Sequence, residues 1–199
     1  LDINEDLIAR YFAGCEWRNT YHGLTIKEAV KEAVRLREVY NVATGANGTA
    51  LELVMRGVFQ INGTDKIGRP VILIRPGLLV DRQVSEDYIS AMLHVLERAE
   101  SICKENKVEN FVSVIDMTSF QWHHMPPMRT VADAMTVLKF LYPDRMGVLY
   151  VVNPGKFFNF VWRVVKPLIS KKSQSNVHIL TLEEYQTIST AESISDEIY

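Results

Sequence analysis

The stretch YPDRMGVLYVVNPGKFFNFVWRVVKPL, residues 142–168, decides how the rest of the sequence is interpreted. A polar turn leads into an apolar, β-prone run, an Asn-Pro-Gly corner and a helical segment, Phe157 to Ile169, whose only charges are positive. Its apolar residues fall on more than one side of a helix: Phe157, Phe158, Phe160, Val161, Trp162, Val164, Val165, Pro167, Leu168 and Ile169. One side can pack on a sheet, so another partner must cover the rest.

Three interpretations of this helix remain open. All-round apolar helices are usually core, which favours a helix covered by the N-terminal helices or by an oligomer partner. Alternatively, one side faces an apolar cavity while the other meets a membrane, where Trp162 enters the interface and each cation contributes about 1 kcal/mol at anionic headgroups. The membrane-facing cations are then Lys156, Arg163, Lys166, Lys171 and Lys172. Nucleic acid is disfavoured, because the aromatic residues alternate with aliphatic ones instead of lying on a polar sheet.

Composition places the chain among ordinary globular proteins. Its 199 residues are 47% hydrophobic and 23% charged, with a net charge of -2, which gives no general attraction to nucleic acid. From Arg145 to Leu182 there is no acidic residue, so one basic sector lies inside a nearly neutral protein. Two cysteines, Cys15 and Cys103, are too few for a disulfide scaffold and fit a reducing cytosol.

The hydrophobic pattern predicts an α/β fold with a mostly parallel sheet and flanking helices, preceded by a small N-terminal helical lobe. The turn-rich run TGANGT, Thr44 to Thr49, suggests a lobe of residues 1–48 and a main domain of residues 49–199. Expected helices are Ile3–Cys15, Thr25–Tyr40, Ser85–Asn106, Met128–Leu141 and Phe157–Ile169; expected strands are Gly57–Asn62, Pro70–Arg75, Phe111–Ile115, Val148–Val152 and Val177–Leu180.

Catalytic signatures are mostly absent. The sequence has no phosphate-binding P-loop, no GxGxxG, no GxSxG and no HExxH. His123 and His124 lie in a Pro-rich loop without a third ligand at metal-binding spacing. Asp116, which ends a buried strand, is interpreted as a carboxylate that caps backbone amides, and Cys103 as a core residue. We therefore predict no catalytic residue, metal or cofactor, and keep an enzyme that uses Asp116, or His123 and His124, as an alternative.

Several runs resemble the CRAL-TRIO lipid-binding family, which includes phosphatidylinositol/phosphatidylcholine transfer proteins and tocopherol-transfer and retinaldehyde-binding proteins. They are DKIGRPV (65–71), FVSVIDM (111–117), YPDRMGVLYVVNPGKFFNFVWRVVKPL (142–168) and NVHIL (176–180). LIARYFAGCEW (7–17) and a helix ending in LREVY are similar to that family's N-terminal lobe. The resemblance implies a hydrophobic cavity over the sheet, closed by a mobile gate helix, and identifies Phe157–Ile169 as that gate.

The resemblance also implies which residues touch a ligand. The lining is expected from Ile61, Ile72, Phe111, Ser113, Met117, Phe120, Met128, Met135, Val151, Phe157, Phe158, Val161, Trp162 and Val165, and polar headgroup contacts from Asp144, Ser173 and Asn176. Phosphoinositide-binding members carry Glu and Lys where this chain has Asp144 and Asn176. The choline-binding polar groups of other members correspond here to Phe111, Ser113, Ile61 and Ile72. These replacements favour a ligand with few polar groups.

The resulting prediction is a protein that binds a hydrophobic molecule or phospholipid without converting it and transfers or presents it at membranes. It predicts a cytoplasmic protein that is peripheral at membranes, docks transiently on a membrane surface and has no nucleic-acid partner. The alternative is a regulatory module that binds a protein partner through the same fold, with lipid as a structural or signalling ligand.

Overall fold

The structure, a computed structural model, describes residues 5–14, 20–79, 85–169, 171–192 and 194, without the side chains of residues 168, 171 and 172. Its helices are α1 (Glu5–Gly14), α2 (Ile26–Val39), α3 (Gly48–Met55), α4 (Ser85–Asn106), α5 (Met128–Leu141), α6 (Phe158–Val165), α7 (Lys171–Ser175) and α8 (Leu182–Glu192). Short 3-10 helices are η1 (Val42–Thr44), η2 (Pro76–Leu78), η3 (Trp122–His124) and η4 (Lys166–Leu168). The strands are β1 (Thr20–Tyr21), β2 (Leu24–Thr25), β3 (Phe59–Thr64), β4 (Pro70–Ile74), β5 (Phe111–Asp116), β6 (Met146–Val152) and β7 (Val177–Leu180).

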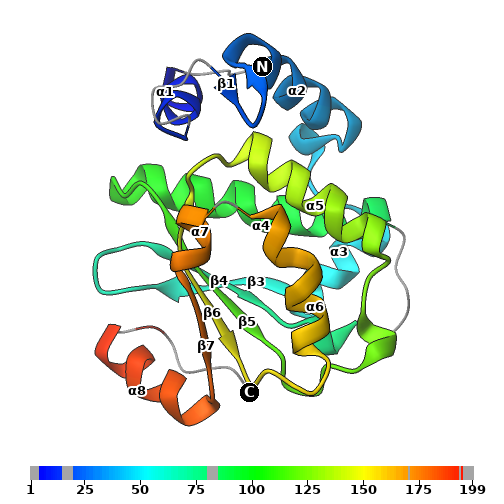
Figure 1. Ribbon diagram of the computed structural model, residues 1–199, viewed down its shortest axis with the longest axis vertical. Helices are drawn as coiled ribbons and strands as arrows, with labels where there is room; N and C mark the ends of the chain where they lie inside the picture. The colour runs from blue at the N-terminus through cyan, green and yellow to red at the C-terminus, as the bar shows by residue number, and fades with distance from the viewer. Residues whose placement is uncertain (1–4, 15–19, 80–84, 170, 193, 195–199) are drawn as a thin grey trace.

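The main sheet has five strands in the order β3-β4-β5-β6-β7 (Figure 1). β3 and β4 pair antiparallel, and the other neighbours pair parallel, which confirms the predicted α/β class. Asp65 holds the turn between β3 and β4, because its carboxylate accepts hydrogen bonds from the backbone of Ile67 and Arg69 at 3.1 and 2.8 Å. β3 starts two residues later than expected, since Gly57, at φ 77°, closes α3 first.

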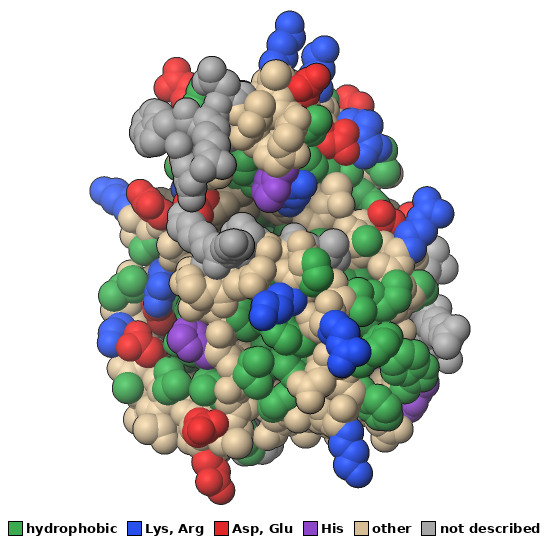
Figure 2. Space-filling view, viewed as in Figure 1, with side chains coloured by type: hydrophobic (Ala, Val, Ile, Leu, Met, Phe, Trp, Pro, Cys, Tyr) green, Lys and Arg blue, Asp and Glu red, His purple; other side chains and the backbone are tan. Residues whose placement is uncertain are grey.

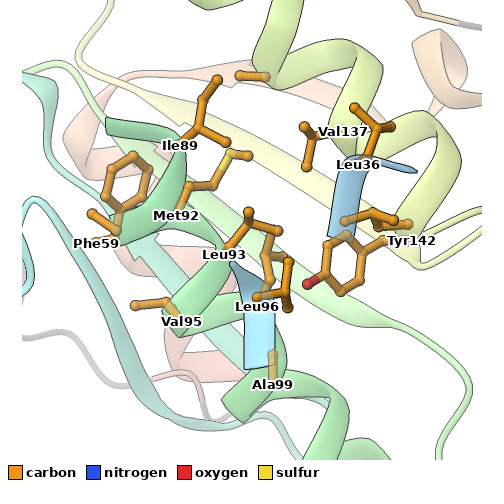
Figure 3. Close-up of a cluster of buried hydrophobic side chains, with 14 of the residues drawn as sticks. Leu36, Phe59, Ile89, Met92, Leu93, Val95, Leu96, Ala99, Val137 and Tyr142 are labelled. Atoms are coloured by element: carbon orange, nitrogen blue, oxygen red, sulfur yellow. The ribbon is translucent and has the colours of Figure 1, made fainter. Parts of the chain in front are cut away.

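Helices cover both faces of this sheet. On one face, α4 and α5 pack against β3, β4 and β5 in a cluster that Figure 3 shows around Phe59, Met92 and Leu93. On the other face, α8 contributes Tyr185, 1% exposed, to a second cluster with Val114. α6 lies in front of the first face, beside α5 (Figure 1). This arrangement places α6 over β5, β6 and β7, and the site described below lies between this helix and these strands.

The N-terminal helices share the main core. α2 begins with the predicted capping box, in which Thr25 and Glu28 exchange hydrogen bonds. Tyr11 and Tyr21 donate their hydroxyl hydrogens to the carbonyl oxygens of Phe140 and Lys139, the latter at 2.9 Å. These carbonyls lie in the last turn of α5, which has no further helical N–H to bind them. The helices are therefore fastened to α5, and the proposed boundary at residue 48 stays a prediction.

Three local predictions were incomplete. The segment interpreted as a linker, Thr44–Thr49, contains the end of η1 and the start of α3. α6 is shorter than the expected Phe157–Ile169 and passes into η4, because Pro167 has no backbone N–H with which to continue the helix. α8 was not predicted, although Thr181 and Glu184 form a capping box with hydrogen bonds of 2.8 and 3.2 Å. Cys103 is buried in α4, as expected.

Candidate functional site

Two rows of side chains cross the face of the five-stranded sheet on which α4, α5 and α6 lie. Because paired residues on neighbouring strands point to the same side, the register fixes both rows. The first row is Ile61, Ile72, Ser113, Leu149 and Val177, and the second is Phe59, Ile74, Ile115, Val151 and Ile179. Nine of these ten side chains are apolar, so the face presents a hydrocarbon floor with a single hydroxyl, that of Ser113.

Burial changes along these rows. At the β3–β4 side, under α4, Phe59 and Ile72 are 2% and 3% exposed. At the β7 side Ile179 is 45% exposed, and Leu149 and Val177 are half-buried. Apolar side chains on a sheet face normally pack under a helix. Leu149, Val177 and Ile179 therefore have apolar surface that the described chain does not cover, whereas Val151, 2% exposed, is covered.

α6 closes part of this floor with two inward aromatic rings. Phe158, 7% exposed, packs with Met117 and Val151, and the half-buried Trp162 packs against the same cluster. The rings of Phe158 and Trp162 are stacked, with centroids 6.1 Å apart. Trp162 thus lies on the floor side of α6, whereas we had also expected it on the membrane side.

The opposite side of α6 is apolar and exposed. Phe157 and Phe160 are 45% and 44% exposed, and the exposed cations Lys156, Arg163 and Lys166 lie along the same segment. Figure 2 shows hydrophobic side chains gathered on this face of the molecule with Lys and Arg side chains among them. Lys171 and Lys172, the other two predicted cations, have side chains outside the described residues.

The predicted lining residues divide between two clusters. Met117, Phe120, Val151, Phe158 and Trp162 come together under α6. Ile61, Ile72 and Phe111 instead belong to the core under α4 and α5, and the buried Ser113 lies between Ile72 and Leu149 in the first row. Val161 and Val165 are half-buried on α6; Met135 is half-buried and Met128 38% exposed on α5. Sequence reasoning missed Leu149, Val177 and Ile179, which strand alternation alone would have placed beside Val151.

The three predicted headgroup residues lie near the amino ends of β6 and β7. Asp144 is exposed in the turn between α5 and β6, with a backbone φ of 56°. Asn176 precedes β7; its carbonyl oxygen accepts a hydrogen bond from the backbone of Leu149 at 2.9 Å, and its N–H donates to the carbonyl of Ser173 at 3.2 Å. The backbones of Ser173 and Asn176 are therefore tied to the start of β7, while a headgroup role for all three side chains stays a prediction.

Tyr142 and Arg145, from the motif that suggested the family, have a different environment. The Tyr142 hydroxyl donates to Glu97 at 2.7 Å, and burial raises the pKa of this tyrosine well above its usual range. The Arg145 side chain, 6% exposed, donates to the carbonyl of Glu109 at 2.7 Å and forms an ion pair with Glu100, in which Nη2 and Nε each lie 2.5 Å from a carboxylate oxygen.

These two residues line a pocket between α1, α2 and α4. Its volume is about 650 Å³, and several of the charged side chains that line it are paired: Asp6 binds Arg10 and Arg145 at 3.0 and 3.2 Å, and Arg37 binds Glu97 at 3.1 Å. Burial raises the pKa of Glu100, and the nearby Arg145 charge opposes that shift. We call Asp6, Arg37, Glu97, Glu100, Tyr142 and Arg145 the ion-pair clamp. It joins the N-terminal helices to α4 and lies away from α6.

The residues of the enzyme alternative have structural contacts. Asp116, 4% exposed, accepts a hydrogen bond from the backbone of Thr118 at 2.9 Å, as expected of a capping carboxylate. His124 accepts one from the backbone of Gln121 at 3.0 Å, and burial and the adjacent His123 lower its pKa. Within the described part of the chain, no three His, Cys, Asp or Glu side chains gather as metal ligands.

Comparison with known proteins gives consistent matches. The sequence model of the CRAL/TRIO domain family matches residues 55–195. Over 135 residues, 60% of the chain, the sequence is similar to two phosphatidylinositol/phosphatidylcholine transfer proteins of Arabidopsis thaliana. It is 25% identical to SFH9 and 24% identical to SFH12. The match spans 23% and 24% of the lengths of those relatives.

Structural comparison gives the same fold. The chain is similar to the crystal structure of Sfh5, with a TM-score of 0.71 and 14% identity over 98% of this chain and 72% of that one. Among the described residues, no helix is both long enough and apolar enough to cross a membrane.

Proposed function

The chain belongs to the CRAL/TRIO domain family, and we propose that it binds one hydrophobic lipid between the sheet floor and α6. It holds the lipid without converting it and transfers or presents it at membranes. The relatives with similar sequences are named as phosphatidylinositol/phosphatidylcholine transfer proteins, which supports a phospholipid or a similarly apolar molecule as the ligand.

The uncovered floor carries this proposal. Leu149 and Val177 are half-buried and Ile179 is 45% exposed, although Ile72, which shares a row with Leu149 and Val177, is only 3% exposed. Transfer of a leucine, isoleucine or valine side chain out of water contributes about 1.5–3 kcal/mol. A lipid chain laid along β6 and β7 would supply that burial, with the inward rings of α6 on its other side.

α6 is proposed to act as the gate. It has sequence signals for hinges at both ends: Asn153-Pro154-Gly155 precedes it, and η4 with Pro167 follows it. Proline and glycine end helical hydrogen bonding at these points, so α6 can rotate as a unit. Membranes would bind the open form more tightly, because Phe158 and Trp162, which face the floor in the closed form, would then contact lipid in addition to the outer rings, and this difference in affinity would drive the opening.

The polar contacts favour a ligand with few polar groups. Ser113 offers one hydroxyl in the floor, and Asp144, Ser173 and Asn176 lie at its edge, near the amino ends of β6 and β7. A headgroup that needs many hydrogen bonds would leave buried polar atoms unpaired here, which costs about 1–3 kcal/mol each. The exposed cations Lys156, Arg163 and Lys166 are proposed to hold the protein transiently at the cytoplasmic face of membranes, where anionic lipids are enriched.

Blocking the floor tests the proposal. Native mass spectrometry of the purified protein should show one copurified lipid, and a fluorescent phosphatidylcholine should pass between vesicles when the protein is added. Leu149→Trp should lower transfer about tenfold or more, because the larger ring occupies the half-buried floor. His178→Trp is the matched control. His178 lies on the neighbouring strand β7, but its side chain is exposed and points to the opposite face of the sheet. A wild-type protein that is empty and transfers nothing would contradict the proposal.

A further inference from the structure

The loop after β5 brings a second exposed aromatic side chain onto α6. Trp122, at the start of η3, is 48% exposed, and its ring centroid lies 5.3 Å from that of Phe160 and 6.1 Å from that of Phe157. The rings of Trp122 and Phe160 meet edge-to-face, an arrangement that aromatic pairs prefer, and the ring of Phe157 is tilted by 52° to that of Trp122. Each of these three aromatic side chains is nearly half exposed, and they come from two segments of the chain. Because they are neighbours, they form a contiguous apolar patch and are not single exposed residues.

Two further contacts hold the loop between β5 and η3, one to the corner before α6 and one to η2. Asn153, at the corner before α6, donates its side-chain N–H to the Thr118 hydroxyl at 3.0 Å, which ties the β6–α6 corner to the β5–η3 loop. Gly77 in η2 lies so close to the same loop that an added Cβ would be 2.5 Å from the carbonyl oxygen of Thr118. Leu78, which follows Gly77, is 40% exposed.

The segments that carry this patch have charges of one sign. Residues 76–79, 117–132 and 145–182, which contain the patch and its flanks, have no acidic residue. The exposed cations Lys156 and Arg163 lie on either side of Phe157 and Phe160 in sequence. Exposed aromatic rings on segments that carry cations and no acidic residue suit the interface of a membrane with anionic lipids, since Trp prefers the headgroup level and each cation gains affinity there.

We propose that η3 and the outer side of α6 form one membrane-docking face with Trp122 at its centre. This inference rests on the proposed lipid function and extends it: the interfacial tryptophan is Trp122, which lies outside the gate helix, and Trp162 serves the floor. While Trp122 remains against Phe157 and Phe160, it holds α6 over the floor. On a bilayer the three rings enter the interface together, so the contact that latches α6 in water is exchanged for lipid.

Vesicle binding tests the docking face. Phosphatidylcholine vesicles with about one quarter phosphatidylserine supply both an apolar interface and anionic headgroups. Trp122→Glu should lower the vesicle partition coefficient about tenfold or more, and Trp122→Phe should keep most of it, because an aromatic ring remains. Phe12→Glu is the matched control: Phe12 is 40% exposed on α1, at the far end of the molecule from η3 (Figure 1). Thermal unfolding verifies that each variant is folded.

The outcomes separate this inference from the proposed function. Loss of vesicle binding in Trp122→Glu alone, with the copurified lipid retained, supports the docking face. Binding equal to wild type, or an equal loss in Phe12→Glu, overturns it. If no protein carries or transfers lipid but Trp122→Glu still loses vesicle binding, the lipid function fails while the docking face stands.

Discussion

Replacing Arg145 with alanine should destabilise the protein more than loss of any ordinary surface arginine. The Arg145 side chain is 6% exposed and that of its partner Glu100 is 17% exposed, so the variant leaves a largely buried carboxylate without its cation. It also removes the hydrogen bond to the Glu109 carbonyl. Breaking a buried ion pair by removing one partner costs about 3–5 kcal/mol. In a chain of this size, that lowers the unfolding temperature by roughly 10 °C.

Urea unfolding followed by circular dichroism measures this change, and Arg98→Ala is its matched control. Arg98 also pairs with a glutamate of α4, Glu105, at 3.5 Å, but the two side chains are 60% and 58% exposed. Exposed pairs of this kind contribute less than about 1 kcal/mol. Equal shifts of the urea midpoint in Arg145→Ala and Arg98→Ala would refute the ion-pair clamp.

The pH dependence of the Arg145 effect gives a second test. Burial raises the pKa of Glu100 above its ordinary value of 4.5, and the Arg145 charge opposes the shift, so its removal raises that pKa further. A carboxyl group whose folded-state pKa exceeds its unfolded value binds protons more tightly in the folded state. Its contribution to stability therefore falls as pH rises from the unfolded pKa through the folded one. We expect Arg145→Ala to cost less at about pH 5 than at about pH 7.5; the reverse order would be inconsistent with a buried, unpaired Glu100.

The remaining predictions concern the packing of η2 and the start of α8. Gly77→Ala places a Cβ 2.5 Å from the Thr118 carbonyl oxygen and should lower the free energy of unfolding in urea by about 1–3 kcal/mol. Gly155→Ala is the control, because a Cβ there would have no atom within 4 Å, and it should leave the stability unchanged. An unchanged urea midpoint for Gly77→Ala would mean that η2 lies farther from the loop. Thr181→Ala removes the capping box of α8 and should lower the free energy of unfolding by about 1 kcal/mol. Amide hydrogen exchange should become faster than in the wild type in α8 but not in α4. Unchanged exchange in α8 would exclude the cap as its anchor.

The site and the clamp use different parts of one sequence motif. In the stretch that begins at Tyr142, the polar residues Tyr142 and Arg145 fasten the N-terminal helices to α4. The apolar continuation supplies β6, whose Leu149 and Val151 form the floor, and then α6. The apolar character of the later part follows from the proposed ligand, and the polar start follows from the need to neutralise buried carboxylates.

Most of the elements could be predicted because local patterns encode them. Amphipathic spacing marked α2, α4 and α5, and the Thr25–Glu28 capping box placed the start of α2. Continuous apolar runs marked β5, which is buried between helices, and β6, of which only the last two residues are buried. α8 was missed because its apolar spacing is weak, so only its cap at Thr181 signals a helix.

The sequence by itself determined the α/β class, the family and the all-round apolar character of the segment after Asn153, since each depends on residues close together in the chain. Only the tertiary structure decided which aromatic residue faces which way. Trp162 stacks on Phe158 over the floor, and Trp122 meets Phe160 at the surface. Likewise, the pairing of Arg145 with Glu100 could not be predicted from the sequence and is known only from the tertiary structure. The reason is physical: periodicity sets which side chains share a face of one element, whereas contacts between distant segments depend on how those elements pack.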